Sequence, residues 1–527
     1  MRTLILSFFL LAVSLSVAGQ SAYSQPSKKL SGQIKKDWHN LDYKESKVYG
    51  TSTNKLYQEV LSDKKPKKKI VVAVIDSGVE IDHEDLKDNI WVNKSEIAGN
   101  GKDDDENGYI DDVHGWNFLV DENGDDIQYD NLEATRVLRE SKKYAPNDDN
   151  IPKWLTDELV SDASRIYNSN VDDYKGMSQF AQFYVVLDSI LTDQLGKEDY
   201  TFDEALELEH DDDPMKSINR ALRAFKLGGL KQEDLIEMYE TSSKYEDYFL
   251  NFEFDPRPEL SQGDKYYGNN HYEGPDATHG THVAGLIAAN RNNEIGARGI
   301  ASEVAEIMVI RAVPDGDERD IDVANAIRYA TDNGANIINM SFGKGVSPRK
   351  PLVDEAIKYA TDNNVLIIHA AGNDSENNDV VANYPNPKFT NGERASSYLT
   401  VGASSSSKRK DMVASFSNYG NDEVDLFAPG HEVYSTVPDQ GYKSLSGTSM
   451  AAPVVSGVAA LIWAYHPELS ASALKSILLS SATDLSRKRV KKPGSKEKVK
   501  FRELCSTGSI VNAYNAYQAA TIRLLNE

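Results

Sequence analysis

A turn of small residues that runs straight into an apolar segment constrains this chain most strongly. Its sequence is Ser444-Leu-Ser-Gly-Thr-Ser-Met-Ala-Ala-Pro453. Gly447 gives the backbone freedom to turn, and Pro453 fits the first turn of a helix, where its missing N–H is not needed. Apolar residues then recur at helical spacing, at Val454, Val455, Val458, Ala459, Leu461 and Ile462. We therefore predict a buried helix that begins beside the hydroxyl of Ser449.

Ser449 would lie at the positive end of that helix, among backbone N–H groups that have no partner within the helix. Such a place suits a nucleophile whose reaction passes through an oxyanion. Serine is also one of the favoured helix N-caps. The segment alone therefore leaves a capping role as open as a catalytic one.

Two further segments place chemically active side chains at the ends of predicted elements. The β-branched run Ile70–Val79 is typical of a strand buried in a parallel sheet, and it ends in Asp76, where α/β folds place their sites. The segment Asp276–Ala289 is a polar turn followed by an apolar helix, with His279 at the helix start. An acid, an imidazole and a hydroxyl form the set needed for nucleophilic acyl transfer.

These three segments resemble the signature motifs of the subtilisin-like serine proteases, the subtilase family or peptidase S8. The order Asp, His, Ser along the chain is also the order of that family. The resemblance covers about residues 65 to 118 and 268 to 520. It implies a serine endopeptidase, in which Ser449 attacks the scissile carbonyl, His279 transfers the proton and Asp76 orients His279.

The rest of the chain alternates strand-like with helical segments. Strands are expected at 307–312, 336–343 and 365–373, with helices at 321–331 and 354–362 between them. This alternation predicts a three-layer, doubly wound α/β fold with a mostly parallel sheet, here carrying a large helical insertion. His369 lies within an apolar strand and is expected to be a core residue.

Asn373 ends one of these strands and forms a fourth motif. Its amide could donate a hydrogen bond to a developing oxyanion, with the backbone N–H of Ser449 as the second donor. By resemblance, Ser341, Phe342 and Gly343 would line the substrate pocket and pair with the substrate backbone. The acidic segment 315–322 would form the opposite rim, which hints at tolerance for basic side chains upstream of the cut. By the same resemblance His282 is structural.

An acidic loop follows the first strand and reads D-x-D-x-N-G-x-x-D from Asp103 onward. It matches the first nine positions of an EF-hand loop, but His114 stands where the bidentate glutamate belongs. Hard oxygen ligands favour calcium, and many subtilases bind structural calcium in such loops. A solvated acidic turn is the alternative. The predicted ligands are Asp103, Asp105, Asn107, the Tyr109 carbonyl, Asp111 and Asp112, with a second, weaker site at Asp121, Asn123 and Asp125. No organic cofactor is expected.

The domain organisation is predicted as follows. Residues 1–19 read as a secretory signal peptide, 20–69 as an N-terminal arm too short and polar for an inhibitory prodomain, and 70–527 as the peptidase domain. An acidic helical insertion interrupts that domain at 127–262, with Phe180, Phe183, Tyr184, Leu187, Ile190 and Leu191 on one helix face. The insertion could be a packing decoration or a lid that restricts substrate entry.

The composition disfavours several classes of binding partner. The net charge of −24 argues against nucleic acid and anionic membranes, and the single Cys505 excludes an internal disulfide framework. No later segment is long and apolar enough for a membrane span. We expect an exported monomer, periplasmic or extracellular, that acts on proteins or peptides.

The sequence disfavours three other functions. An inactive subtilase scaffold that only binds would be expected to lack a triad member or Asn373, and all four residues are present. A zinc hydrolase is disfavoured because His279 and His282 are spaced H-x-x-H and no H-E-x-x-H occurs. An esterase of the α/β-hydrolase type would place the serine before the histidine.

Overall fold

The computed structural model describes residues 32–145, 148–197, 200–208, 213–228, 232–258 and 267–526. The chain forms two compact units. The sheet unit contains the described residues up to 133, residues 152–155 and those from 255 onward, and the helical unit contains 134–151 and 156–254. The predicted signal peptide lies outside the described residues.

A nine-stranded sheet organises the sheet unit, in the order β10-β13-β7-β6-β5-β4-β1-β3-β2. All neighbouring strands run parallel except β10 and β13. The bounds are β1 Ile70–Asp76, β2 Gly115–Asn117, β3 Ala305–Arg311, β4 Ile337–Met340, β5 Leu366–Ala370, β6 Tyr398–Ser404, β7 Leu426–Pro429, β10 Thr483–Asp484 and β13 Ser509–Ile510. Two antiparallel pairs complete the strands: β8 Val433–Val437 with β9 Gly441–Leu445, and β11 Arg489–Lys491 with β12 Lys498–Lys500.

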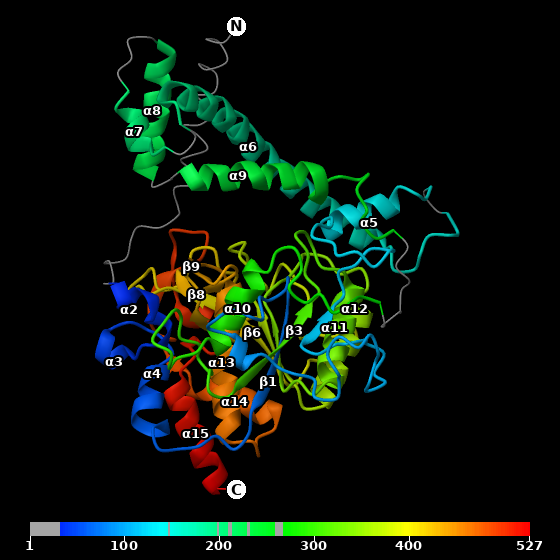
Figure 1. The fold of residues 1–527 in the computed structure, drawn as a ribbon, viewed down its shortest axis with the longest axis vertical. Coiled ribbons are helices and arrows are strands. Elements are labelled where there is room, and N and C mark those ends of the chain that lie inside the picture. The colour runs from blue at the N-terminus through cyan, green and yellow to red at the C-terminus, as the bar shows by residue number, and fades with distance from the viewer. Residues whose placement is uncertain are drawn as a thin grey trace. The chain divides into compact units, whose positions relative to one another are not determined.

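Helices cover both faces of the sheet, which makes the three layers visible in Figure 1. On one face α10 Thr278–Ala288, α13 Thr448–Tyr465, α14 Ala471–Ser481 and α15 Ala513–Asn526 share an apolar cluster with the sheet. On the other face α11 Asp320–Asp332 and α12 Lys350–Asp362 form a second cluster. Alternate residues of β1 enter the two clusters, because side chains of a strand point to opposite faces. The predicted fold class is confirmed.

Helix α13 lies at the centre of this core. It is the one helix of the described residues that is long and apolar enough to cross a membrane, and 94% of that window is buried inside the protein. The helix begins at Thr448, so Pro453 is its sixth residue and lies in the second turn rather than in the predicted first. A proline there removes one intrahelical hydrogen bond.

The N-terminal segment packs on the sheet unit. It contains α2 Gly32–Lys36, α3 Tyr43–Ser46 and α4 Thr53–Leu56. Trp38 is fully buried in the cluster around α13, and its indole N–H donates to the carbonyl of Glu432 at 3.1 Å. Leu41 and Tyr57 pack against the same cluster. These contacts attach the N-terminal segment to the core of the sheet unit.

The helical unit has an apolar core of its own. Its helices are α5 Glu133–Ser141, α6 Asp157–Leu195, α7 Phe202–Leu206, α8 Asp213–Gly228 and α9 Gln232–Lys244. Tyr184, Leu187 and Leu191 of α6 are buried against residues of α7, α8 and α9. The insertion was expected to span 127–262, whereas the structure groups 127–133 and 255–258 with the sheet unit.

Candidate active site

Asp76 and His279 form a hydrogen-bonded pair at the carboxyl edge of the sheet. Asp76 is the last residue of β1, His279 is the second residue of α10, and their Oδ1 and Nδ1 atoms are 2.7 Å apart. Asp76 is 2% exposed, whereas the side chain of His279 is 39% exposed. Gly280 permits this approach, because a Cβ there would lie 2.1 Å from the carbonyl oxygen of Gly78. A buried carboxylate therefore holds a half-exposed imidazole.

The charges around His279 favour its protonated form. Burial acts to lower its pKa, but the charge and hydrogen bond of Asp76, aided by Asp276 and Asp315, outweigh burial and raise the pKa above its usual value. An imidazolium formed at this position is therefore stabilised.

Ser449 is tied to the end of β4 by two reciprocal hydrogen bonds. Its hydroxyl donates to the carbonyl of Ser341 at 2.9 Å, and the hydroxyl of Ser341 donates to the carbonyl of Ser449 at 2.9 Å. Since β1 and β4 pair in parallel with Ile75 opposite Met340, Ser341 follows β4 at the level of Asp76. The serine and the acid are thus brought to neighbouring strand ends.

Pro453 explains the second of these bonds. In a regular helix the carbonyl of Ser449 would accept from the N–H of residue 453, and proline has none. Ser341, which is 3% exposed, supplies the missing donor from outside the helix. The proline therefore makes the main chain at Ser449 depend on the sheet.

The hydroxyl of Ser449 is hydrogen-bonded to Ser341 and not to His279. Within the described part of the chain, the structure records no bond between Ser449 Oγ and His279 Nε2, and Oγ donates to Ser341 instead. Catalytic hydrogen bonds are often loose in unliganded enzymes. The structure brings Asp76 and His279 into contact and leaves Ser449 to be reoriented.

Asn373 and the start of α13 offer two N–H groups that lie close to one point beside Gly447. The Oδ1 of Asn373 accepts from the N–H and the hydroxyl of Thr448, at 2.8 and 3.0 Å. A Cβ placed on Gly447 would lie 3.6 Å from Asn373 Nδ2 and 3.5 Å from the backbone N of Ser449. Both nitrogens therefore border the same space beside Gly447.

The predicted substrate segment extends β4. His369 Nε2 donates to the carbonyl of Phe342 at 2.7 Å, and Lys344 exchanges two backbone hydrogen bonds with Tyr384. Gly343 between them is exposed. His369 is buried in β5, as expected, and burial lowers its pKa to about 4, so that it is neutral and fixes this segment.

His282 faces away from the pair. It is fully buried, and its Nε2 lies 3.1 Å from the carbonyl oxygens of both Val433 and Lys443. Burial lowers its pKa to about 3. These contacts fit the structural role expected for it.

Several of the predicted ligands in the acidic loop accept hydrogen bonds from backbone N–H groups. Asp103 accepts from the backbone N–H groups of Asn107 and Gly108, and Asp111 accepts from those of Asn100 and Gly101. These two carboxylates therefore close turns. Asn107 uses its Oδ1 for the N–H of Tyr109.

Three carboxylates do converge beside this loop, namely Glu96, Asp105 and Asp112, each with one oxygen within 4.8 Å of the others. Glu96 and Asp112 are buried. Burial, aided by the charge of Asp105, raises the pKa of Asp112 to about 6 against the hydrogen bonds of Tyr329, Asn93 and Asn107. Sequence reasoning missed Glu96, because it lies outside the repeating loop pattern.

The second acidic turn is smaller. Asp121 accepts from the backbone N–H groups of Asn123 and Asp125, at 2.8 and 2.9 Å. Its three predicted residues are not among the groups of described carboxylates and imidazoles that converge on one point.

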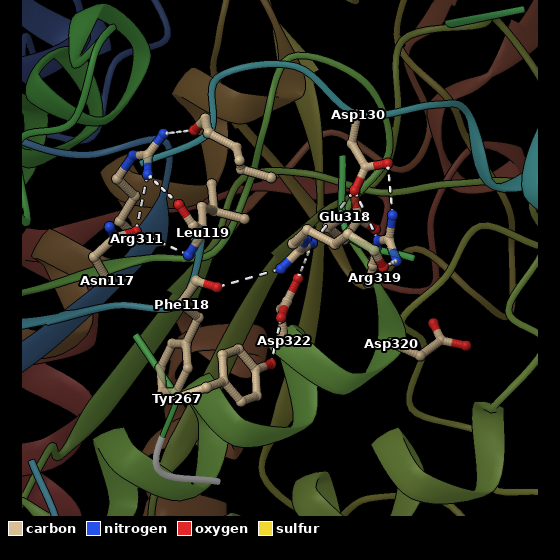
Figure 2. A network of polar contacts seen from close by, with 12 residues as sticks. Asn117, Phe118, Leu119, Asp130, Tyr267, Arg311, Glu318, Arg319, Asp320 and Asp322 are labelled. Carbon is tan, nitrogen blue, oxygen red and sulfur yellow. Dashed lines mark hydrogen bonds and ion pairs between the residues drawn. The ribbon is translucent and has the colours of Figure 1, made fainter. Parts of the chain in front are cut away.

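A buried ionic network joins the residues that flank the helical unit to the start of α11, as Figure 2 shows. Asp130 binds Arg319 at 2.8 Å and Arg257 at 3.3 Å, and Arg257 binds Asp322 at 2.5 Å. Asp322 also accepts from Tyr267. Arg257, Asp130 and Asp322 have no exposed side-chain surface. None of these residues carries a sequence signal, because their pairing depends on three distant segments.

A profile described as "Subtilase family" matches residues 67–496. The chain belongs to the subtilase family. The matched range contains Asp76, His279 and Ser449.

Several curated proteins are similar to parts of this subtilase. Subtilisin DY of Bacillus licheniformis is 39% identical over 210 residues, which cover 39% of this chain and 71% of that protein. Thermitase of Thermoactinomyces vulgaris is 38% identical over 35% of this chain and 60% of its own length. The Cell wall-associated protease of Bacillus subtilis is 38% identical over 42% of this chain and 23% of its own length.

A solved structure titled "Proteases from Pseudoalteromonas arctica PAMC 21717" is 20% identical, with a TM-score of 0.47 over 94% of this chain and 100% of that one. The fold class rests on the sheet described above and on the family match.

We predict that Ser341→Ala destabilises the protein by about 1–3 kcal/mol, because it leaves the buried carbonyl of Ser449 without a donor. In Pro453→Ala, residue 453 regains an N–H that can donate to the carbonyl of Ser449. Ser341→Ala should therefore lower the free energy of unfolding by less in the Pro453→Ala background than in the wild type. A double-mutant cycle of urea unfolding measures the coupling. A Ser449→Ala background prevents self-digestion. Equal costs in both backgrounds would show that the two residues act independently.

We also predict that Asp276→Asn and Asp315→Asn shift the acidic limb of the pH–kcat/KM profile to lower pH. Both carboxylates raise the pKa of His279, and the base must be neutral to accept a proton. Removing them lowers that pKa, so activity persists further into acid. The shift should shrink with added salt. Asp422→Asn, an exposed control that does not act on His279, should leave the limb unchanged.

Proposed function

We propose that this subtilase is an exported serine endopeptidase that hydrolyses peptide bonds through an acyl-enzyme. The observation that carries the proposal is the 2.7 Å bond between buried Asp76 and half-exposed His279 at the strand edge that also holds Ser449. An oriented imidazole beside a serine at a helix start is the arrangement that activates a hydroxyl.

The reaction would begin with a rotation of the Ser449 side chain, which moves its hydroxyl from the Ser341 carbonyl to His279 Nε2. The oxygen then attacks the substrate carbonyl while His279 takes the proton. Asp76 stabilises the imidazolium, which next protonates the leaving amine. Water repeats the two steps on the acyl-enzyme and regenerates Ser449.

The developing oxyanion would lie in the space beside Gly447, between Asn373 Nδ2 and the N–H of Ser449. Thr448 supports this role because its two hydrogen bonds hold the amide oxygen of Asn373 and turn the amide nitrogen toward that space. In the related subtilisin, loss of one such donor costs about 100- to 1000-fold in turnover.

One observation favours the second candidate, an inactive binding scaffold. The hydroxyl of Ser449 donates to Ser341 and not to His279. The same hydroxyl is half-buried at the helix start, and a serine has only one torsion to change. We therefore favour the protease and let the nucleophile test decide.

Export is part of the proposal. It is supported by relatives whose names place them outside the cell, namely a "Cell wall-associated protease" and a "Halolysin-like extracellular serine protease" of Natrialba magadii. The basic and apolar start of the sequence, ending in small residues, agrees with this destination.

We further propose that Glu96, Asp105 and Asp112 hold a structural calcium ion. Oxygen ligands at 2.3–2.6 Å from calcium lie at most about 5 Å apart, and one oxygen of each carboxylate meets that limit. Carboxylates are hard ligands, and three of them packed together gain most from a hard cation. Calcium would offset two of their three negative charges and fix the loop that follows β1.

Ser449→Ala should reduce casein hydrolysis by about 10⁴-fold or more and abolish labelling by a fluorophosphonate probe, because it removes the nucleophile. Ser446→Ala, in the same turn, is the matched control, since its hydroxyl accepts from the N–H of Glu432 and faces no reacting group. Retained hydrolysis in Ser449→Ala would exclude the proposed mechanism. A wild-type protein that is neither labelled nor active would favour the binding scaffold.

Calcium should raise the Tm of the wild-type protein by several degrees, since a ligand that binds only the folded state stabilises it. Asp105→Asn with Asp112→Asn should abolish the rise. The Asp104→Asn control changes charge in the same loop, but that carboxylate accepts from Ile97 N and Asn100 Nδ2 and lies outside the cluster. An equal rise in wild type and double variant, measured by calorimetry after chelation, would contradict the site.

A further inference from the structure

Lys344 directly follows the exposed Gly343, yet its own side chain is only 2% exposed. Its ammonium lies 2.6 Å from Glu133 Oε2, 2.8 Å from Asp320 Oδ1 and 2.6 Å from the carbonyl oxygen of Glu318. The side chain therefore reaches from the segment after β4 to the acidic segment before α11.

The backbone places this lysine directly after the segment that is predicted to pair with a substrate. Lys344 exchanges its N–H and C=O bonds with Tyr384, at 3.0 and 2.9 Å. Because these groups alternate in direction along an extended chain, those of Gly343 point to the side opposite Tyr384. Gly316 lies in the acidic segment before α11. Within the described residues, neither its main-chain N–H and C=O groups nor those of Gly343 make a backbone hydrogen bond to a loop. Two segments with open backbone edges are thus bridged by one side chain.

The bridge lies at a defined distance from the chemistry. Ser341 bonds the nucleophile Ser449, and Lys344 is three residues further along the same extended segment. At 3.3 Å per residue this separation is about 10 Å. A peptide paired with this segment would therefore present to Lys344 a side chain about three residues from the scissile bond.

The space that Lys344 fills is acidic. Glu133 and Asp320 share its ammonium, and the carboxyl group of Glu318, which is 2% exposed, belongs to the same region. Burial raises the pKa of Glu318 to about 8 against the attraction of Lys344, so Glu318 is protonated at neutral pH. Without the lysine, the buried carboxylates of Glu133 and Asp320 would have no cation from this side chain.

We propose that Lys344 is a specificity-determining residue that fills, with its own ammonium, a subsite built for a basic substrate side chain. This inference rests on the proposed protease function. The acidity of 315–322 alone suggests that basic side chains are welcome. Lys344 supplies the cation internally, so we expect the wild-type protein to exclude basic side chains at this subsite.

The test is a cleavage-site profile of wild type and Lys344→Ala on one peptide library, read at every position on both sides of the cut. Lys344→Ala should gain a preference for Lys or Arg over Ala of about tenfold or more in kcat/KM at one position. Lys350→Ala is the matched control, because Lys350 bonds Asp354 and the carbonyl of Lys388 instead. Its profile should match the wild type.

A second readout needs no catalysis. n-Butylammonium should raise the Tm of Lys344→Ala by occupying the vacated space, whereas n-butanol should not, and neither should act on Lys350→Ala. If Lys344→Ala does not fold, the variant that adds Glu133→Gln removes one of the uncompensated charges and is used for both readouts.

The outcomes separate the two proposals. A wild-type enzyme that already prefers Lys or Arg there, or a Lys344→Ala profile equal to wild type despite normal fluorophosphonate labelling, overturns the subsite and leaves the protease intact. Absent labelling of the wild type overturns the protease. The amine effect on Tm then still decides whether the space accepts a cation, and equal effects of butylammonium and butanol contradict it.

Discussion

The parallel register of β1, β4 and β5 is the constraint on which the site depends. Because the strands run the same way, their carboxyl ends meet at one edge of the sheet. Asp76 is the last residue of β1, Ser341 directly follows β4, and Asn373 lies shortly after β5. The two apolar clusters hold this register, since a shift of one residue would turn every buried side chain to the wrong face. The site residues themselves contribute little to this register, which the buried strands set.

Helix α13 is fixed to that edge by more than packing. Its apolar surface would tolerate small rotations, but the two bonds between Ser341 and Ser449 set the position of the helix start to hydrogen-bond accuracy. Pro453 creates the need for one of them. A feature that looks like a local helix defect thus becomes a link between the main chain of Ser449 and the sheet, and the other bond holds the Ser449 hydroxyl on the Ser341 carbonyl.

Sequence reasoning reached the parts of this site that lie at the ends of strongly periodic segments. The β-branched run to Asp76 and the apolar run after Ser449 each carry a local signal of buried structure, and the family resemblance connected them. Glu96 and Arg257 could not be found in this way, because each acquires its role from segments far away in the chain. The EF-hand pattern fits two roles, because short acidic residues also close turns by accepting backbone N–H groups, as Asp103 and Asp111 do.

The flanks of the helical unit and the acidic rim share one set of buried charges. Glu133, the last residue before that unit in the sheet unit, binds Lys344, and Asp130 and Arg257 on the two flanks bind Arg319 and Asp322. Breaking a buried pair strands an uncompensated charge, which costs far more than losing an exposed one. The flanks therefore cannot shift without disturbing the segment 315–322. The residues at the two ends of the insertion are therefore tied by buried charges to the segment 315–322 and to Lys344.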